Sequence, residues 1–269
     1  RDWAGAEYLP PEGVGCVVAA NHLSEIDPMV VAHFLNDNDR VPRFMAKASL
    51  FQTPVTGSLL RHVGQIPVYR GSKDAVESLR GAFEAVDRGG CVVVYPEATL
   101  TRDPGMWPMR GKSGAARIAM ETGCPVIPLA HWGAQRLLPP YARVARLFPP
   151  VTVTVRAGPA VDLSDLSGAR SASALREATD RILADVTGLL EGIRGEPAPA
   201  ERIDPARAGV AATGNPRKSE RGRAASRTSD HRHEEEGRHA GNSDGDGVVG
   251  HGVRHGADGR GHRRDDVGV

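Results

Sequence analysis

GCVVAANHLSEIDP, residues 15–28, contains the pattern that decides the fold of this chain. It opens with a continuous apolar run of strand length, which is typical of a strand covered on both faces. The run ends at Asn21-His22. Asp27-Pro28 then predicts a helix start, with a carboxylate at the N-cap and proline at the first helical position. The stretch therefore predicts a buried strand followed by a helix.

The same alternation recurs along the chain. Further strands are predicted at 44–46, 65–69, 91–95, 126–129 and 151–156. Helices are predicted at 28–35, 72–89 (with Ser72 as N-cap), 113–122 and 175–193, with a broken, partly helical stretch at 49–62. We therefore predict an α/β fold, a largely parallel β-sheet flanked by helices. Ligands in such folds bind beyond the carboxyl ends of the strands.

The composition of the 269 residues changes sharply near residue 195. Phe, Trp and Tyr are absent after Phe148, and Leu, Ile and Met are absent after Ile203. The remainder cannot bury enough apolar surface to offset its ordering entropy. We therefore predict a folded domain at 1–195 and a disordered low-complexity tail at 196–269.

The tail contains six of the ten histidines, without regular metal-ligand spacing, and we predict no metal site. A further hypothesis concerns the segment from Ser226 onward. Its Gly-His-Gly and Arg-His pattern resembles a GC-rich gene translated out of frame, so it would not be natural coding sequence. Detection of its peptides in cells by mass spectrometry would contradict that hypothesis.

The net charge of +1 favours no particular partner, and the basic residues are too dispersed for a nucleic-acid module. Cys16, Cys91 and Cys124 lie in apolar stretches and are predicted to be buried, in a reducing compartment. No apolar run reaches the roughly 18–20 residues that cross a bilayer. Because the chain starts with Arg1 instead of Met, we expect the natural N-terminus to be missing, with a membrane anchor as one alternative for its content.

Three common enzyme motifs do not fit. Residues 109–114, MRGKSG, resemble the end of a phosphate-binding P-loop, but the required first glycine would fall at Met106. Gly13-Val14-Gly15 lacks the third glycine of a dinucleotide-binding loop. No Gly-x-Ser-x-Gly elbow is present. These observations disfavour a nucleotide triphosphatase, a dinucleotide fold and an α/β serine hydrolase.

His22 and Asp27 place an imidazole and a carboxylate near the end of the first predicted strand. A carboxylate that holds one ring nitrogen fixes the tautomer, so the other nitrogen can take a proton from an alcohol. No serine or cysteine nucleophile is needed if the substrate brings its own hydroxyl. The alternative is structural, a helix cap and a core histidine, and the two interpretations are compatible. Lys47, Arg70 and Glu97 also follow predicted strands directly and belong at the same sheet edge.

Four short motifs in a fixed order resemble those of the glycerolipid acyltransferase family, typified by 1-acylglycerol-3-phosphate acyltransferases. They are Asn21-His22 with Asp27, Gly64-Gln65-Ile66 with Arg70, Tyr95-Pro96-Glu97-Ala98-Thr99 with Arg102, and Cys124-Pro125-Val126-Ile127-Pro128. The resemblance spans residues 7–195. Ala98 departs from the family's glycine, and Leu100-Thr101 separates Thr99 from Arg102. Because an alanine reaches positive φ only at a cost, the geometry of this loop is affected.

The resemblance implies an O-acyltransferase, with its acyltransferase domain at 1–195. His22 would deprotonate the free hydroxyl of 1-acyl-sn-glycerol-3-phosphate, which then attacks an acyl thioester to give phosphatidic acid, while Asp27 orients His22. The thioester, of coenzyme A or acyl carrier protein, is a co-substrate, and no permanently bound cofactor is expected. Glycerol-3-phosphate and other lysophospholipids are alternative acceptors. A catalytically weak phospholipid-binding member is an alternative of a different class.

The resemblance also implies a set of side chains that bind the acceptor. The predicted set is Arg70, Glu97, Thr99, Arg102, Lys47, Arg110 and Lys112. Arg70 and then Arg102 are the first candidates for the phosphate, because a guanidinium binds two oxygens at once. Glu97 is expected to hold an arginine or a substrate hydroxyl. Arg110 and Lys112 would add anion binding at a helix start. The alternatives are structural ion pairs or a solvated surface.

Because a long-chain acyl group resides in a bilayer or on a carrier, the site is expected to open at a membrane surface. Residues 49–62, with Leu50, Phe51, Leu59 and Leu60 beside Arg61, are the predicted contact, and core packing of the leucines is the alternative. We expect membrane association at the cytoplasmic face, either peripheral or through a missing N-terminal segment.

Overall fold

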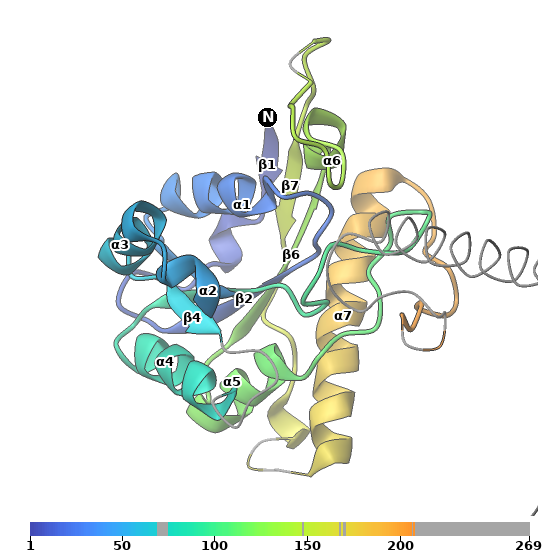
Figure 1. Ribbon diagram of the computed structural model, residues 1–269. Coiled ribbons are helices and arrows are strands. Elements are labelled where there is room, and N and C mark those ends of the chain that lie inside the picture. Colours follow the sequence, from blue (N-terminus) through green and yellow to red (C-terminus); the bar gives the residue numbers. More distant parts are fainter. Residues whose placement is uncertain (69–74, 147, 167, 169–170, 206, 208–269) are drawn as a thin grey trace, which may run out of the picture. The chain divides into compact units, whose positions relative to one another are not determined.

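The computed structural model describes residues 1–68, 75–146, 148–166, 168, 171–205 and 207 (Figure 1). All of them lie within one compact unit, Arg1–Arg217. The predicted N-cap Ser72, Arg70 and the tail from residue 208 onward lie outside the described residues.

The described strands form one seven-stranded sheet in the order β1-β7-β6-β2-β5-β3-β4. Their bounds are β1 Asp2–Ala4, β2 Cys16–Ala20, β3 Pro42–Lys47, β4 Ile66–Val68, β5 Cys91–Val94, β6 Val126–Trp132 and β7 Thr154–Ala157. Every neighbouring pair is parallel except β6 and β7. The prediction of a largely parallel sheet is confirmed, and the short edge strand β1 was not predicted.

The helices connect these strands as the alternation predicts. They are α1 Asp27–Asn36, α2 Ala48–Phe51, α3 Pro54–His62, α4 Ala75–Asp87, α5 Gly114–Thr122, α6 Ala134–Leu137 and α7 Ala172–Arg194, with short 3-10 turns at Ala6–Tyr8 and Ser164–Leu166. The broken stretch predicted at 49–62 is the pair α2 and α3. None of the described helices is long and apolar enough to cross a membrane.

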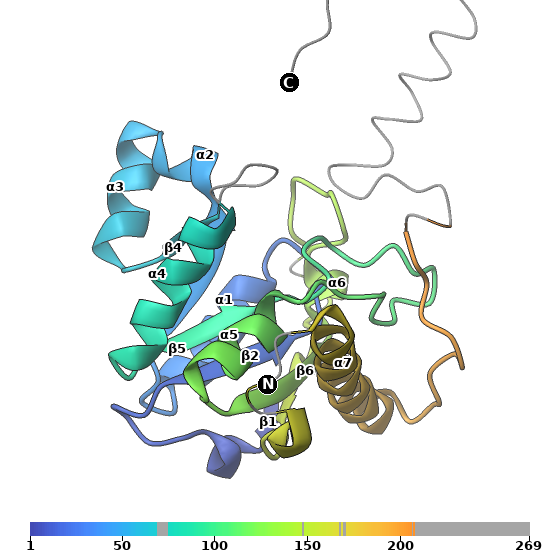
Figure 2. The ribbon, with the colours of Figure 1, turned by 90° about the horizontal axis from the view of Figure 1, so that it is seen from below.

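The central strands β2 and β5 are fully buried because helices cover both faces of the sheet (Figure 2). Val17 and Val92 face a cluster built on α4, α5 and α7. Val18 and Val93 point to the opposite face, where they pack against α1. Burial on both faces explains why these strands read as continuous apolar runs instead of alternating ones. Cys124 is half-buried, so the prediction of burial holds fully only for Cys16 and Cys91.

The chain continues past the end of α7 in a described segment at 196–205. The Ala198 N–H donates to Glu191 Oε1 at 2.7 Å, and Ile203 O accepts the Arg110 N–H at 2.9 Å. Asp204 forms an ion pair with Arg110 at 3.0 Å. Although apolar side chains are few here, these polar contacts attach the segment to α7 and to the loop that follows β5.

Candidate active site

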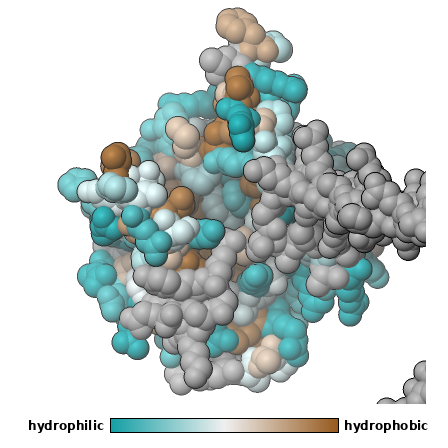
Figure 3. All heavy atoms as spheres, in the orientation of Figure 1, coloured by the Kyte–Doolittle hydropathy of each residue, from teal (hydrophilic) through white to brown (hydrophobic). Residues whose placement is uncertain are grey.

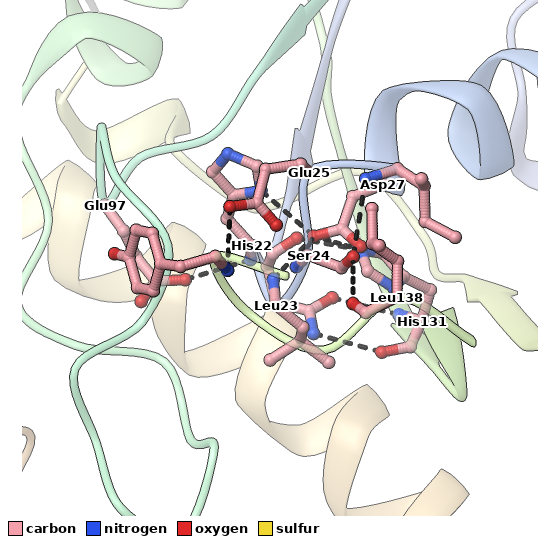
Figure 4. Close-up of polar contacts among 11 residues, drawn as sticks. His22, Leu23, Ser24, Glu25, Asp27, Glu97, His131 and Leu138 are labelled. Carbon is pink, nitrogen blue, oxygen red and sulfur yellow. Dashed lines mark hydrogen bonds and ion pairs between the residues drawn. The ribbon is translucent and has the colours of Figure 1, made fainter. Parts of the chain in front are cut away.

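His22 and Asp27 lie where β2 ends and α1 begins, and their side chains meet (Figure 4). His22 Nδ1 donates to Asp27 Oδ2 at 3.0 Å. The Asp27 side chain is fully buried, whereas that of His22 remains 18 % exposed. No described residue is hydrogen-bonded to His22 Nε2. The pair therefore presents one ring nitrogen outward while a buried carboxylate fixes the other, which is the arrangement of a general base.

Backbone groups of the turn before α1 hold the Asp27 carboxylate in place. Oδ2 accepts the N–H groups of Leu23 at 2.5 Å and of Ser24 at 2.7 Å. The predicted N-cap role is wrong, because Ile26 is the N-cap and Asp27 is the first residue of α1. Its carboxylate reaches back into the preceding turn instead of forward along the helix. A single oxygen, Asp27 Oδ2, therefore both holds the turn 22–27 together and contacts the His22 ring.

Asn21 joins the carboxyl ends of β2 and β6 directly behind this pair. Its amide donates to His131 O at 3.0 Å, and its Oδ1 accepts the His131 backbone N–H at 2.9 Å. The buried His131 ring donates from Nε2 to Asn21 O at 2.9 Å, and this nitrogen lies 3.7 Å from Asp27 Oδ2. Sequence reasoning missed His131. A polar ring at the carboxyl end of an apolar strand was the signal that could have found it.

Tyr95 and Glu97 position His22 from the end of β5. The Tyr95 ring stacks on the His22 ring, with centroids 4.1 Å apart and an interplanar angle of 17°. Glu97 Oε1 accepts the His22 backbone N–H at 3.1 Å, and its Oε2 accepts the Met109 N–H at 3.0 Å. Glu97 was expected to hold an arginine or a substrate hydroxyl. The structure instead gives its carboxylate two backbone partners.

Burial changes the proton affinity of Glu97. Desolvation raises its pKa from 4.5 to about 8, against the two backbone hydrogen bonds, which lower it, and with the charge of Asp27 raising it further. Burial likewise raises the pKa of Tyr95 well above its usual value. Glu97 therefore lies in a low-dielectric environment that favours the neutral acid, close to the backbone of His22.

Thr99 and Arg102 lie on the loop beyond Glu97. Arg102 Nη2 donates to Thr99 Oγ1 at 3.4 Å, and both residues are half-buried. Ala98, which stands where the family has glycine, has a φ of 58°, in the left-handed region. The loop thus has the conformation that glycine adopts freely, and alanine adopts it under strain. The alanine at position 98 therefore carries a conformational cost.

Tyr141 reaches the site from the loop between α6 and β7. Its N–H donates to Glu25 Oε1 at 2.9 Å, and the Arg102 guanidinium carbon lies 5.3 Å from the centre of its ring. Ser24 Oγ donates to Leu138 O at 2.6 Å and attaches the same loop. Sequence reasoning also missed Tyr141, since no motif lies between α6 and β7.

The remaining predicted site residues differ in their exposure and in their partners. Lys47 is the exposed last residue of β3, at the same edge as His22, and Lys112 is exposed. Arg110 is ion-paired with Asp204, so a partner in the chain already engages this predicted anion-binding side chain. Arg70 lies outside the described residues. The structure therefore joins His22, Asp27 and Glu97 by hydrogen bonds. The loop that carries Thr99 and Arg102 is attached to them by the Thr101 N–H, which donates to His22 O at 2.8 Å.

An outward-facing imidazole backed by a buried carboxylate, at the carboxyl edge of a parallel sheet, has the geometry that general-base chemistry on a substrate hydroxyl requires. Comparison with known proteins agrees with this class of chemistry. A family model described as Acyltransferase matches residues 2–132.

Proteins of known name also match about half of this chain. The chain is 32% identical over 139 residues to the chloroplastic 1-acyl-sn-glycerol-3-phosphate acyltransferase BAT2 of Brassica napus, covering 51% of this chain and 39% of that protein. It is 28% identical over 127 residues to a 1-acyl-sn-glycerol-3-phosphate acyltransferase of Bacillus subtilis, covering 47% of this chain and 60% of the relative. The match therefore spans less than two thirds of either relative.

A solved structure shares the fold. The 1-acyl-sn-glycerophosphate acyltransferase PlsC of Thermotoga maritima superposes with a TM-score of 0.56 at 25% identity, covering 74% of this chain and 73% of that one. Together, the family model, the named relatives and the solved structure support the glycerolipid acyltransferase family for this chain.

Proposed function

We propose that this protein transfers a fatty acyl group from a thioester to the free hydroxyl of 1-acyl-sn-glycerol-3-phosphate, giving phosphatidic acid. The observation that carries the proposal is the His22–Asp27 pair, with Nδ1 fixed at 3.0 Å from Oδ2 and Nε2 without a described partner. The relatives named as 1-acyl-sn-glycerol-3-phosphate acyltransferases support the choice of acceptor.

The chemistry is a direct acyl transfer. His22 Nε2 takes the proton of the acceptor hydroxyl as its oxygen attacks the thioester carbonyl, and the new carbon–oxygen bond replaces the carbon–sulfur bond. The departing thiolate then takes the proton from His22. Asp27 stabilises the imidazolium that forms in between, since its buried charge lies beside Nδ1. No side-chain nucleophile and no bound cofactor takes part in this route.

Binding of the acceptor phosphate falls to the loop beyond β5. Thr99 offers a hydroxyl and Arg102 a guanidinium, the group that suits two phosphate oxygens at once. Lys47 at the end of β3 adds an exposed positive charge at the same edge. Arg70 remains a proposed phosphate ligand on the strength of its motif alone. Arg110 is the weakest candidate, because Asp204 already pairs with it.

Because the proposed substrates are lipids, the site is expected to open at a bilayer surface. On α2 and α3, Leu50 and Leu59 are exposed, whereas Phe51 and Leu60 are half-buried. Of the four apolar residues predicted to contact the bilayer, only Leu50 and Leu59 are therefore exposed. Val55 adds another exposed apolar side chain on α3. We propose that the protein is membrane-associated through these exposed side chains, at the cytoplasmic face.

A panel of acceptors tests the proposal. The protein is incubated with labelled acyl-coenzyme A or acyl-acyl carrier protein and with 1-acylglycerol-3-phosphate, glycerol-3-phosphate or another lysophospholipid. Labelled phosphatidic acid from the first acceptor at the highest kcat/KM is expected. A higher kcat/KM with another acceptor would reassign the substrate. No turnover with any pair, together with binding to phospholipid vesicles, would instead favour a phospholipid-binding member of the family.

A further inference from the structure

The loop that connects α6 to β7 exposes large apolar side chains to solvent. Val144 is 77% exposed and Phe148 is 87% exposed. Arg143 and Arg146 are exposed beside them. The segment 139–150 contains no acidic residue, and no described carboxylate forms an ion pair with either arginine. We name this segment, in its described residues 139–146 and 148–150, the rim loop.

The rim loop lies at the edge of the sheet where the candidate active site opens. It follows β6, whose carboxyl end holds His131 behind Asp27. Figure 1 shows it projecting beyond the sheet, and Figure 2 shows it rising on the same side as α2 and α3. Helices α2 and α3 follow the carboxyl end of β3. In Figure 3, brown spheres lie among teal ones on both projections.

Contacts at the base of the rim loop fix it to the site. Tyr141 binds Glu25 through its backbone N–H, and its ring lies against Arg102. The Arg146 N–H donates to Leu137 O at 2.7 Å, which closes the loop on itself. The base is therefore attached to residues of the site, while Val144 and Phe148 remain largely exposed.

We propose that the rim loop docks on an anionic phospholipid surface. Val144 and Phe148 enter the headgroup region, and Arg143 and Arg146 bind lipid phosphates. Burial of two exposed apolar side chains supplies the hydrophobic part of the attraction. Two arginines near a negative surface supply the electrostatic part. This docking rests on the proposed function only for its purpose, the delivery of lipid substrates to the site.

The charge pattern favours a bilayer over a protein partner or a second copy of the chain. A lipid surface offers phosphates at one depth and hydrocarbon just below it. The rim loop offers Arg143 and Arg146 beside the apolar residues Val144 and Phe148. Since the whole chain has a net charge of only +1, attraction to anionic lipid has to come from a local cluster of this kind.

Co-sedimentation of the full chain with vesicles tests the proposal. The vesicles contain phosphatidylcholine alone or an equimolar mixture with phosphatidylglycerol. The double variant Val144→Ser/Phe148→Ser should bind the mixed vesicles at least about tenfold more weakly than the wild type. Arg143→Gln/Arg146→Gln should lose most of the preference for phosphatidylglycerol.

The matched control is Val41→Ser. Val41 is 66% exposed next to the start of β3, at the opposite edge of the sheet, and its replacement should leave vesicle binding unchanged. Unchanged binding by Val144→Ser/Phe148→Ser would overturn the proposal, as would an equal loss in Val41→Ser. In a second measurement, the tryptophan fluorescence of Phe148→Trp should shift to shorter wavelength on adding vesicles, by more than that of the wild type. A shift no larger than in the wild type would contradict insertion of the rim loop.

The two proposals fail separately. A protein that catalyses no acyl transfer but binds vesicles in a manner dependent on Val144 and Phe148 would support docking and refute the proposed function. A Val144→Ser/Phe148→Ser variant that loses activity on vesicle-bound substrate, yet keeps wild-type activity on short-chain soluble substrates, would support both.

Discussion

The carboxylate of Glu97 accepts the backbone N–H of His22 at 3.1 Å from a fully buried position. Its pKa is raised to about 8 in the folded protein, above 4.5 for the free side chain. The folded state therefore binds a proton more tightly than the unfolded state between these two values. The contribution of this group to stability is complete below about pH 4.5 and is lost as the pH rises toward about 8.

The Glu97→Gln variant tests this linkage, because it removes the titrating group. Denaturant unfolding of both proteins between pH 5 and pH 8 should show that the wild-type free energy of unfolding falls more steeply with pH, by up to about 1.4 kcal/mol per pH unit. Parallel curves for the two proteins would show that Glu97 does not titrate in this range.

Replacement of Ala98 by glycine should stabilise the protein. The φ of 58° costs alanine about 1–2 kcal/mol, while glycine gives back about 0.5–1 kcal/mol through the entropy of the unfolded chain. We expect Ala98→Gly to raise the free energy of unfolding by up to about 1 kcal/mol. The control Ala184→Gly, at an exposed position of helix α7, should lower it by about 1 kcal/mol. Destabilisation by both variants would contradict the assigned strain.

Arg102 and Arg110 should differ in their effect on the acceptor. Because charged hydrogen bonds to phosphate are strong, Arg102→Ala should raise the KM for 1-acylglycerol-3-phosphate roughly tenfold to a hundredfold. Arg110 is engaged by Asp204, and Arg110→Ala should change this KM by less than about threefold. Steady-state kinetics with the acceptor varied provides the comparison. The reverse order of effects would move the phosphate to the start of α5.

Tyr141 is expected to orient Arg102 through its ring. Tyr141→Phe keeps the ring and should keep the KM of the acceptor within about twofold, whereas Tyr141→Ala should raise it roughly threefold to tenfold with a smaller change in kcat. The same measurements with a variable thioester serve as a control, because the donor KM should stay constant. Equal loss in both variants would assign the effect to the hydroxyl instead of the ring.

The sheet could be predicted from the sequence because its central strands are covered on both faces. Because β2 and β5 are buried, each is a continuous apolar run in the sequence. The apolar stripe of helix α7 is equally easy to recognise from its helical spacing. Strand β1 has only three residues at the sheet edge and leaves no such pattern. The antiparallel pairing of β7 was also unpredicted, because an alternating strand does not record the direction of its neighbour.

The His22–Asp27 pair could be predicted because both members lie in one motif. Tyr141 could not, since it lies 116 residues beyond Glu25 and meets it only through the fold. His131 lies 110 residues beyond Asn21, and its only sequence signal was a polar ring at the end of an apolar strand. The partners of Glu97 are backbone groups, which any sequence could supply. Sequence motifs therefore indicate which side chains gather, and the fold decides whether each one contacts substrate or supports a neighbour.

The proposed acyl transfer depends on His22 as its general base. The most direct test is the kcat/KM for 1-acylglycerol-3-phosphate in the wild type and in His22→Ala, with added imidazole as a rescue and thermal unfolding as the check of folding. General-base catalysis by His22 predicts a loss of about 10²- to 10⁴-fold that imidazole partly restores. A folded His22→Ala protein with wild-type kcat/KM would contradict it.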